Sequence, residues 1–225
     1  LRQENNATTS GASDRNSFYA SAGYLDDGGL VSGSGFKRTS LRLKDDYKVN
    51  KWMTVGANIS YTYSESFYPD DQTSSASSGN AFALANTMAP IYPFYVRDAE
   101  GNILMNTAND GTRDRSFMSI SNPGGQLKYD KRQFIADIMS NNWYINLTPI
   151  EGLSLKAQWA LNIDNTNFNS LQNAYMGQFA SLQGGASQAH TRVYGFDQQY
   201  IANYTHTFAA KHNIDITLGY DGYSY

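Results

Sequence analysis

The chain has 225 residues, a formal net charge of -3 at pH 7 and no cysteine. A disulfide framework, a thiolate metal site and a cysteine nucleophile are therefore excluded, and without a basic excess no nucleic-acid partner is expected. Aromatic residues make up 14% of the chain, with 17 tyrosines, which favours strands and argues against a disordered chain. No stretch approaches the roughly 18 apolar residues of a transmembrane helix.

Alternation of apolar and polar residues predicts the strands. In chain order it occupies residues 17–24, 36–47, 52–66, 141–147, 153–164, 194–206 and 213–220, which gives seven strands. The run from Trp52 to Ser66 alternates strictly over about twelve positions, whereas a sandwich strand has about 5 to 6 residues and a membrane-spanning strand about 9 to 11. Length therefore favours membrane-spanning strands. The segment Ala7–Ser13 is too short and too polar to add an eighth strand.

The connections between these strands alternate between short and long. Residues 48–51, 148–152 and 207–212 make short links, whereas residues 25–35, 67–132 and 167–189 make long ones. Transmembrane barrels have short periplasmic turns and longer extracellular loops. The predicted fold is therefore all-β: an antiparallel transmembrane β-barrel segment with long extracellular loops at 67–132 and 167–189.

The alternation also predicts which way each side chain faces. The residues expected to face lipid are Met53, Val55, Ala57, Ile59, Leu155, Trp159, Leu161, Ile216 and Leu218. Those expected to face inward are Asn58, Ser60, Gln158, Asn162 and Thr217.

Aromatic residues gather in the longest loop and are the candidate ligand contacts. They are Phe67, Tyr68, Tyr92, Phe94 and Tyr95. Aromatic faces stack on sugar rings and peptide side chains, so these residues are predicted to touch cargo; the alternative is that they anchor the loop to itself or to a partner subunit.

No residue pattern predicts a catalytic or metal-binding site. The histidines His190, His206 and His212 lack metal-ligand spacing, and the carboxylate pairs Asp45–Asp46 and Asp70–Asp71 lack an apolar pocket that would raise a pKa. We therefore predict no catalytic, cofactor-binding or metal-binding residue, and no enzyme activity.

Several runs resemble one family. They are residues 18–31 (FYASAGYLDDGGLV), 33–38 (GSGFKR), 49–61 (VNKWMTVGANISY), 149–153 (PIEGL) and 208–214 (FAAKHNI). Together they resemble the SusC/RagA-type TonB-linked outer-membrane transporters of Bacteroidetes. The resemblance implies a nutrient importer in the bacterial outer membrane that takes up glycans or peptides. It also implies two partners, a SusD-like surface lipoprotein and the TonB complex, the latter engaged through a plug region.

Neither a plug domain nor a TonB-engaging segment is found in these residues. Transporters of this type have roughly 22 strands around a plugged lumen, and seven strands cannot close such a barrel. Residues 1–225 are therefore expected to be part of one β-barrel domain, an internal slice without the plug, whose first and last strands are free edges or pair with further chain. Two alternatives stay open: a small outer-membrane barrel or adhesin, and a soluble secreted β-rich carbohydrate-binding module.

Overall fold

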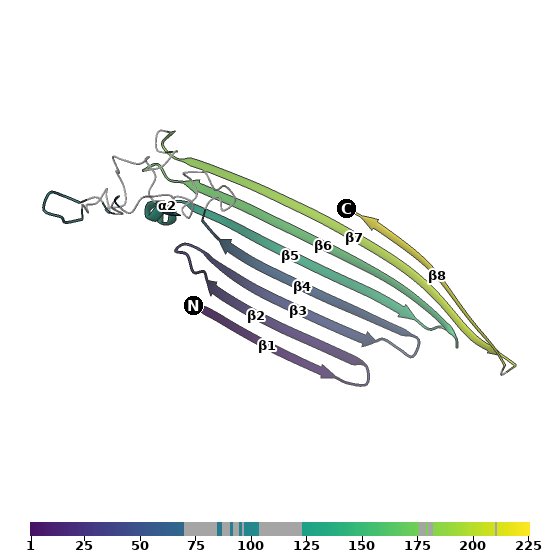
Figure 1. Cartoon of the computed structure of the whole chain (residues 1–225). Coiled ribbons are helices and arrows are strands. Elements are labelled where there is room, and N and C mark those ends of the chain that lie inside the picture. The colour runs from purple at the N-terminus through teal and green to yellow at the C-terminus, as the bar shows by residue number, and fades with distance from the viewer. Residues whose placement is uncertain are drawn as a thin grey trace.

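The structure, a computed structural model, describes residues 1–69, 85–86, 91, 95, 97–103, 123–175, 179, 182–209 and 211–225. These residues form one antiparallel sheet in which every strand pairs with its neighbours in the chain (Figure 1). The strands are β1 (Arg2–Ala12), β2 (Asn16–Gly28), β3 (Gly35–Lys48), β4 (Met53–Phe67), β5 (Lys131–Leu147), β6 (Leu153–Gln172), β7 (Gly185–Phe208) and β8 (His212–Ser224). The predicted all-β antiparallel class is confirmed.

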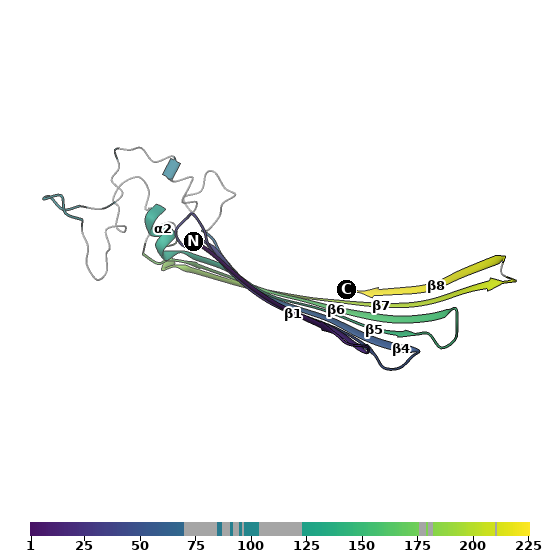
Figure 2. The same cartoon turned by 90° about the horizontal axis from the view of Figure 1, so that it is seen from below.

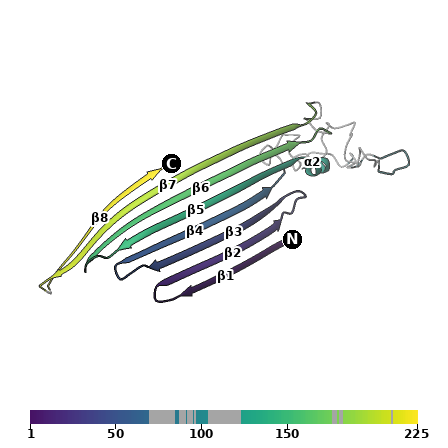
Figure 3. The same ribbon diagram turned by 180° about the vertical axis from the view of Figure 1, so that it is seen from behind.

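The sheet is a single curved layer. Seen nearly edge-on in Figure 2, the strands form a thin twisted band, and the view from behind in Figure 3 shows the same order of strands from the other side. Helix α2 (Pro123–Tyr129) lies at one end of the band. Each described strand packs mainly against its neighbours in this layer. Among the described residues, no helix is long and apolar enough to cross a bilayer.

Strand β1 corrects the prediction of seven strands. The segment Ala7–Ser13 was judged too short and polar, but β1 covers 11 residues and pairs with β2 from Arg2↔Asp27 to Ala12↔Ser17. The prediction was wrong because it required an apolar face. A β-ladder is made by backbone groups, so a polar segment beside an established strand completes that ladder without apolar side chains.

The register divides the side chains between two faces, because directly opposed residues of antiparallel strands share a face. One row on the first face runs from β3 to β8 through Tyr47, Val55, Ile145, Ala157, Tyr200 and Tyr220. One row on the other face runs through Arg42, Ser60, Ser140, Asn162 and Gly195. We call them the apolar face and the polar face. All residues predicted to share an outward face lie on the apolar face, and all those predicted to share an inward face lie on the polar face.

The connections separate as predicted. Residues 13–15, 49–52, 148–152 and 209–211 link strands at one end of the sheet, and residues 29–34, 68–130 and 173–184 link them at the other (Figure 1). The strands run further than the alternation indicated: β6 continues to Gln172 and β7 begins at Gly185, inside the predicted 167–189 loop. Alternation is lost there because both faces are polar, but backbone pairing continues.

Candidate functional site

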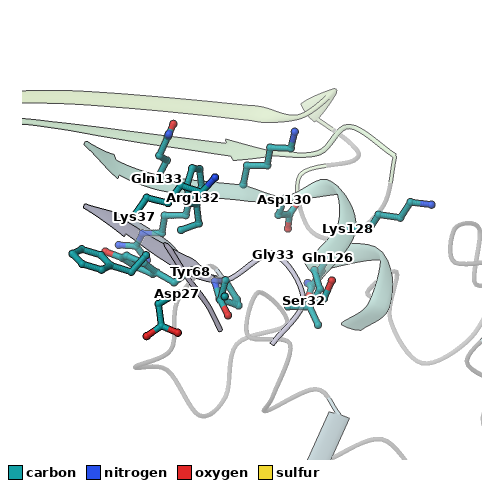
Figure 4. Close-up of a pocket in the computed structure, with 18 of the residues that line it drawn as sticks. Asp27, Ser32, Gly33, Lys37, Tyr68, Gln126, Lys128, Asp130, Arg132 and Gln133 are labelled. Atoms are coloured by element: carbon teal, nitrogen blue, oxygen red, sulfur yellow. The ribbon is translucent and has the colours of Figure 1, made fainter. Parts of the chain in front are cut away.

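A cavity of about 450 Å³ lies at the end of the sheet that carries the long connections (Figure 4). Its volume falls within the roughly 300 to 1,000 Å³ of ligand pockets. Its walls come from the 29–34 turn, the end of β4, helix α2 and the start of β5. Its charged and aromatic lining includes Asp26, Lys37, Phe67, Tyr68, Asp130 and Arg132.

The turn between β2 and β3 is built to approach helix α2 closely. Gly33 has a φ of 78°, a left-handed conformation that favours glycine. A Cβ atom on Gly33 would lie 3.1 Å from the carbonyl oxygen of Leu127 in α2. Ser34 closes the turn, since its backbone N–H donates to the Val31 carbonyl at 3.0 Å. The glycine therefore lets the turn and the helix form one wall of the cavity.

Asp130 connects this wall to the third connection of the same rim. Its carboxylate accepts hydrogen bonds from the backbone N–H of Asn173, at 2.8 Å, and from the Asn173 side-chain amide. Asn173 is buried and in turn accepts from the backbone N–H of Tyr175 at 2.9 Å. The rings of Tyr129 and Tyr175 meet edge to face, with centroids 5.5 Å apart. The 68–130 and 173–184 connections are thus held together beside the cavity.

An aromatic cluster lies on the polar face beneath Arg132. The Tyr68 and Phe134 rings stack with centroids 5.3 Å apart, and Phe134 meets Phe168 at 4.7 Å. The Arg132 guanidinium lies 5.3 Å from the Tyr68 ring centroid and 5.0 Å from that of Phe168. Cation–π contacts of this kind are worth about 0.5 to 1 kcal/mol each at exposed sites. The cluster fixes Tyr68 at the cavity wall.

The cavity also carries charges of both signs. The Lys37 ammonium lies 3.6 Å from the Asp26 carboxylate, and Figure 4 shows Lys37, Arg132 and Gln133 on one side with Asp130 and Gln126 on another. Aromatic faces beside mixed charges suit a ligand with both ring or apolar groups and polar groups. The arrangement offers binding contacts rather than a nucleophile paired with a base.

Two of the five predicted contact residues line the cavity: Phe67 and Tyr68. Tyr95 is exposed and does not line it. Tyr92 and Phe94 lie outside the described residues. Contact with cargo stays a prediction for all five.

The segment after Tyr95 is a tight turn. Asp98 accepts from the Asn102 backbone N–H at 2.7 Å, and Arg97 pairs with Ile103 as an isolated bridge. Desolvation opposes ionisation of Asp98, but hydrogen bonds from Asn102 and from the backbone N–H groups of Glu100 and Gly101 together lower the pKa of this carboxyl. Residues Asp98 to Gly101 therefore form a closed turn.

Sequence reasoning missed Arg132, Phe134 and Phe168. A signal was available: the alternation through 141–147, carried back along β5, places Phe134 on the polar face near the start of the strand. A large aromatic side chain at a polar-face position near the strand end that borders the cavity is a candidate contact. In the described parts of the chain, no three His, Asp or Glu side chains gather where a metal ion would fit.

Comparisons with known proteins agree with the resemblance noted in the sequence. The chain is 26% identical over 226 residues to TonB-dependent receptor P39 of Formosa agariphila, covering 98% of this chain and 19% of that protein. It is 25% identical over 213 residues to TonB-dependent receptor P3 of the same organism, covering 94% of this chain and 20% of that protein. No protein-family model matches the chain.

Solved structures of the RagAB peptide importer are also similar. In the closed-closed state the match has a TM-score of 0.71 with 25% identity and covers 97% of this chain and 24% of that one. In the open-open state the TM-score is 0.69 with 26% identity, over 97% and 23% of the two chains. The resemblance to SusC/RagA-type TonB-linked transporters is confirmed, and the sheet is that of a barrel segment. The chain spans about a fifth of the length of the curated relatives that it matches.

Proposed function

We propose that this chain forms part of the barrel wall and outer loops of a TonB-dependent importer of the SusC/RagA type in the bacterial outer membrane. The observation that carries the proposal is the division of one sheet into a continuous apolar face and a polar face. Large apolar side chains on the apolar face are exposed, with Leu43 at 58% and Leu218 at 69%. A barrel in lipid needs such a surface outside and polar side chains inside.

The height of the apolar face fits a bilayer. On β6 it runs from Leu153 to Ile163, which at about 3.3 Å per residue is about 33 Å along the strand. A strand tilted by about 45° then crosses about 23 Å, close to the roughly 25 Å apolar band of outer-membrane barrels. Above Ile163 the same face carries Asn165, Asn167 and Asn169, so β6 rises beyond the membrane toward the candidate site.

The partners and cargo are proposed by analogy with the relatives. The solved relatives are described as peptide importers, which supports peptides as the first cargo class to test, with glycans as the second. A SusD-like lipoprotein would cover the outer rim, and the TonB complex would act through a plug region. The proposed role is capture and passage of cargo with no chemical step in this segment.

The two rival functions fit less well. A soluble carbohydrate-binding module buries one face of each sheet under a second layer, whereas the described elements contact one another within a single layer. A small closed barrel or adhesin would pair β1 with β8, and these are the two outer strands of the described sheet.

Spin labels on neighbouring residues test the membrane assignment. Cysteines are introduced singly at Leu218 and Thr217, and at Ile59 and Asn58, in the full-length protein that carries this segment. In lipid vesicles, labels at Leu218 and Ile59 should collide more with oxygen, which concentrates in lipid, and their neighbours more with a water-soluble nickel complex. Equal nickel accessibility at all positions would favour the soluble module.

Uptake measurements test transport and the cavity. Cells with the protein should accumulate labelled peptide or oligosaccharide only while the proton-motive force is intact. Tyr68→Ala, at the cavity, should raise the cargo Kd severalfold, because a ring stacked on one aromatic side chain contributes about 0.5 to 1.5 kcal/mol. Phe208→Ala, at the opposite rim, is the matched control and should leave the Kd unchanged. Uptake that persists after uncoupling would contradict energised import.

A further inference from the structure

We infer that the outer surface of the β6–β7 hairpin binds the phosphorylated saccharide headgroup of a glycolipid, the lipopolysaccharide class found in the outer leaflet of bacterial outer membranes. The inference rests on the proposed function, since it needs the apolar face to meet lipid and the long connections to lie outside. Six side chains above the apolar stretch carry it, and we call them the outer ladder: Asn165, Asn167, Asn169, Gln188, His190 and Arg192.

The outer ladder continues the apolar face beyond its apolar stretch. Its members are three directly opposed pairs, Asn165↔Arg192, Asn167↔His190 and Asn169↔Gln188. The next pair on the same face, toward the short turns, is Ile163↔Tyr194, and Tyr194 is 51% exposed. Tyrosine is enriched where membrane hydrocarbon meets the headgroups. The ladder therefore begins at headgroup height.

The height of the ladder matches a layer of headgroups. From Asn165 to Asn169 the strand extends about 13 Å at about 3.3 Å per residue, and at a tilt of about 45° it rises about 9 Å. This surface is the outside of the barrel wall, so cargo inside the lumen does not reach it. A lipid whose chains cover the apolar face places its headgroup against the ladder.

The charge of the ladder suits a phosphate group. The Arg192 guanidinium donates to the side-chain oxygen of Asn165 at 3.3 Å and to the Tyr194 hydroxyl at 3.4 Å, and both partners are neutral. Within the described residues, Arg192 makes no ion pair. Arginine presents a fork of N–H donors that matches the oxygens of a phosphate. An anionic headgroup would supply the charge that Arg192 lacks.

Two carboxylates of the same face lie on β4 and β5 and have other partners. The Tyr61 hydroxyl donates to Asp137 at 2.5 Å, and the Tyr63 hydroxyl donates to Glu65 at 2.5 Å. Asp137 lies opposite Asn165, on the side of β6 away from β7. The β7 side of the ladder therefore keeps its positive charge.

The amides of the ladder suit sugar hydroxyl groups. An Asn or Gln side chain both donates and accepts, as a hydroxyl group does. Gln188 donates to Asn169 at 2.9 Å, which leaves further donors and acceptors on these two amides. A cavity of about 400 Å³ opens beside them, within the range of ligand pockets. Its lining on this face includes Lys131, Gln133, Asn169, Leu171, Ala186 and Gln188.

The composition of the ladder favours a lipid headgroup over a protein partner. The centre of a protein interface is rich in aromatic and apolar residues, whereas the ladder is made of amides and two basic side chains. The apolar side chains that border it, Ile135, Leu171 and Tyr194, lie on three different strands. A second copy of the chain would find no apolar centre here.

Lipid binding by the full-length protein in detergent tests the inference, with native mass spectrometry to follow the bound lipid. The probes are lipid A with its phosphates, lipid A without them, and phosphatidylglycerol, which has the charge without the saccharide. Arg192→Gln removes the cation, and Arg42→Gln, on the polar face, is the matched control. Asn167→Ala/Asn169→Ala removes amides without changing charge. Heat-modifiable migration in gels checks that each variant folds.

The wild-type protein should bind phosphorylated lipid A at least tenfold more tightly than either other probe. Arg192→Gln should raise the Kd for lipid A about tenfold, because a charge-assisted hydrogen bond to phosphate is lost, while Arg42→Gln should match wild type. Asn167→Ala/Asn169→Ala should weaken both forms of lipid A by the same factor. This variant and the comparison of lipids on wild type decide the matter if Arg192→Gln does not fold.

Equal Kd values for Arg192→Gln and Arg42→Gln would overturn the inference. Wild-type binding of phosphatidylglycerol as tight as that of lipid A would do the same, because it would show attraction to any anionic lipid. A protein dimer that Arg192→Gln dissociates would assign the ladder to a second copy instead. A wild-type protein that forms no heat-modifiable barrel in detergent would refute the proposed function itself.

Discussion

Leu43→Arg is the sharpest test of which face meets lipid. Leu43 lies on the apolar face of β3, opposite Ile59 and midway along the apolar stretch, with 58% of its surface exposed. An arginine at the bilayer midplane of an outer-membrane barrel costs about 2 to 4 kcal/mol. That cost lowers the ratio of folded to unfolded protein by about 30- to 700-fold, at about 1.4 kcal/mol per factor of ten.

Ile138→Arg is the matched control. Ile138 is also an exposed apolar residue, at 42%, but it lies on the polar face directly opposite Asp164. An arginine there faces a carboxylate across the strands and should be neutral or slightly stabilising. Thermal loss of the folded band is measured by semi-native electrophoresis of the full-length variants. Equal penalties at the two positions would refute the assignment of the faces, and a larger penalty at Ile138 would reverse it.

Two further predictions concern the polar face and the rim. Gly56→Leu should lower the midpoint of thermal unfolding, because a side chain at this position overlaps the Tyr144 ring and breaks the 2.6 Å hydrogen bond from Tyr144 to Asp46. A hydrogen bond to a charged group contributes about 1.5 to 3 kcal/mol. A midpoint equal to that of wild type would contradict this packing. Arg132→Ala should speed proteolysis of the 68–130 connection severalfold, since three cation–π contacts are lost; an unchanged cleavage rate would show that the cluster does not anchor that connection.

The sequence predicted those strands in which apolar and polar side chains alternate. Strand β4 alternates from Met53 to Ser64, so its existence and its facing could be predicted. Strand β1 could not, because Asn5, Asn6, Thr8 and Thr9 give no contrast between faces and its order comes from pairing with β2. Polar strand ends, as in β6 beyond Asn165, are ordered for the same reason.

The candidate site was partly predictable. Phe67 and Tyr68 could be found because they stand where a strand ends and a long connection begins. Arg132 reaches the cavity only because β4 pairs with β5, and more than sixty residues separate these two strands in the chain. A pairing between segments so far apart cannot be read from local sequence. The link from Asp130 to Asn173 likewise joins two separate connections. Such contacts are set by tertiary structure and have no local signature.

The edges of the sheet yield the last prediction. Within the described sheet, β1 and β8 each pair on one side only, over 11 and 13 residues. About half of the backbone groups of an edge strand point to its free side, and each one left unpaired in hydrocarbon costs several kcal/mol. Side-chain packing within one layer cannot offset that sum, so residues 1–225 expressed alone should not insert as a stable monomer. The test is refolding in detergent followed by semi-native electrophoresis and protease treatment. A heat-resistant, protease-resistant, β-rich monomer would require β1 and β8 to close on each other, and would favour the small-barrel alternative over a wall segment of a larger importer.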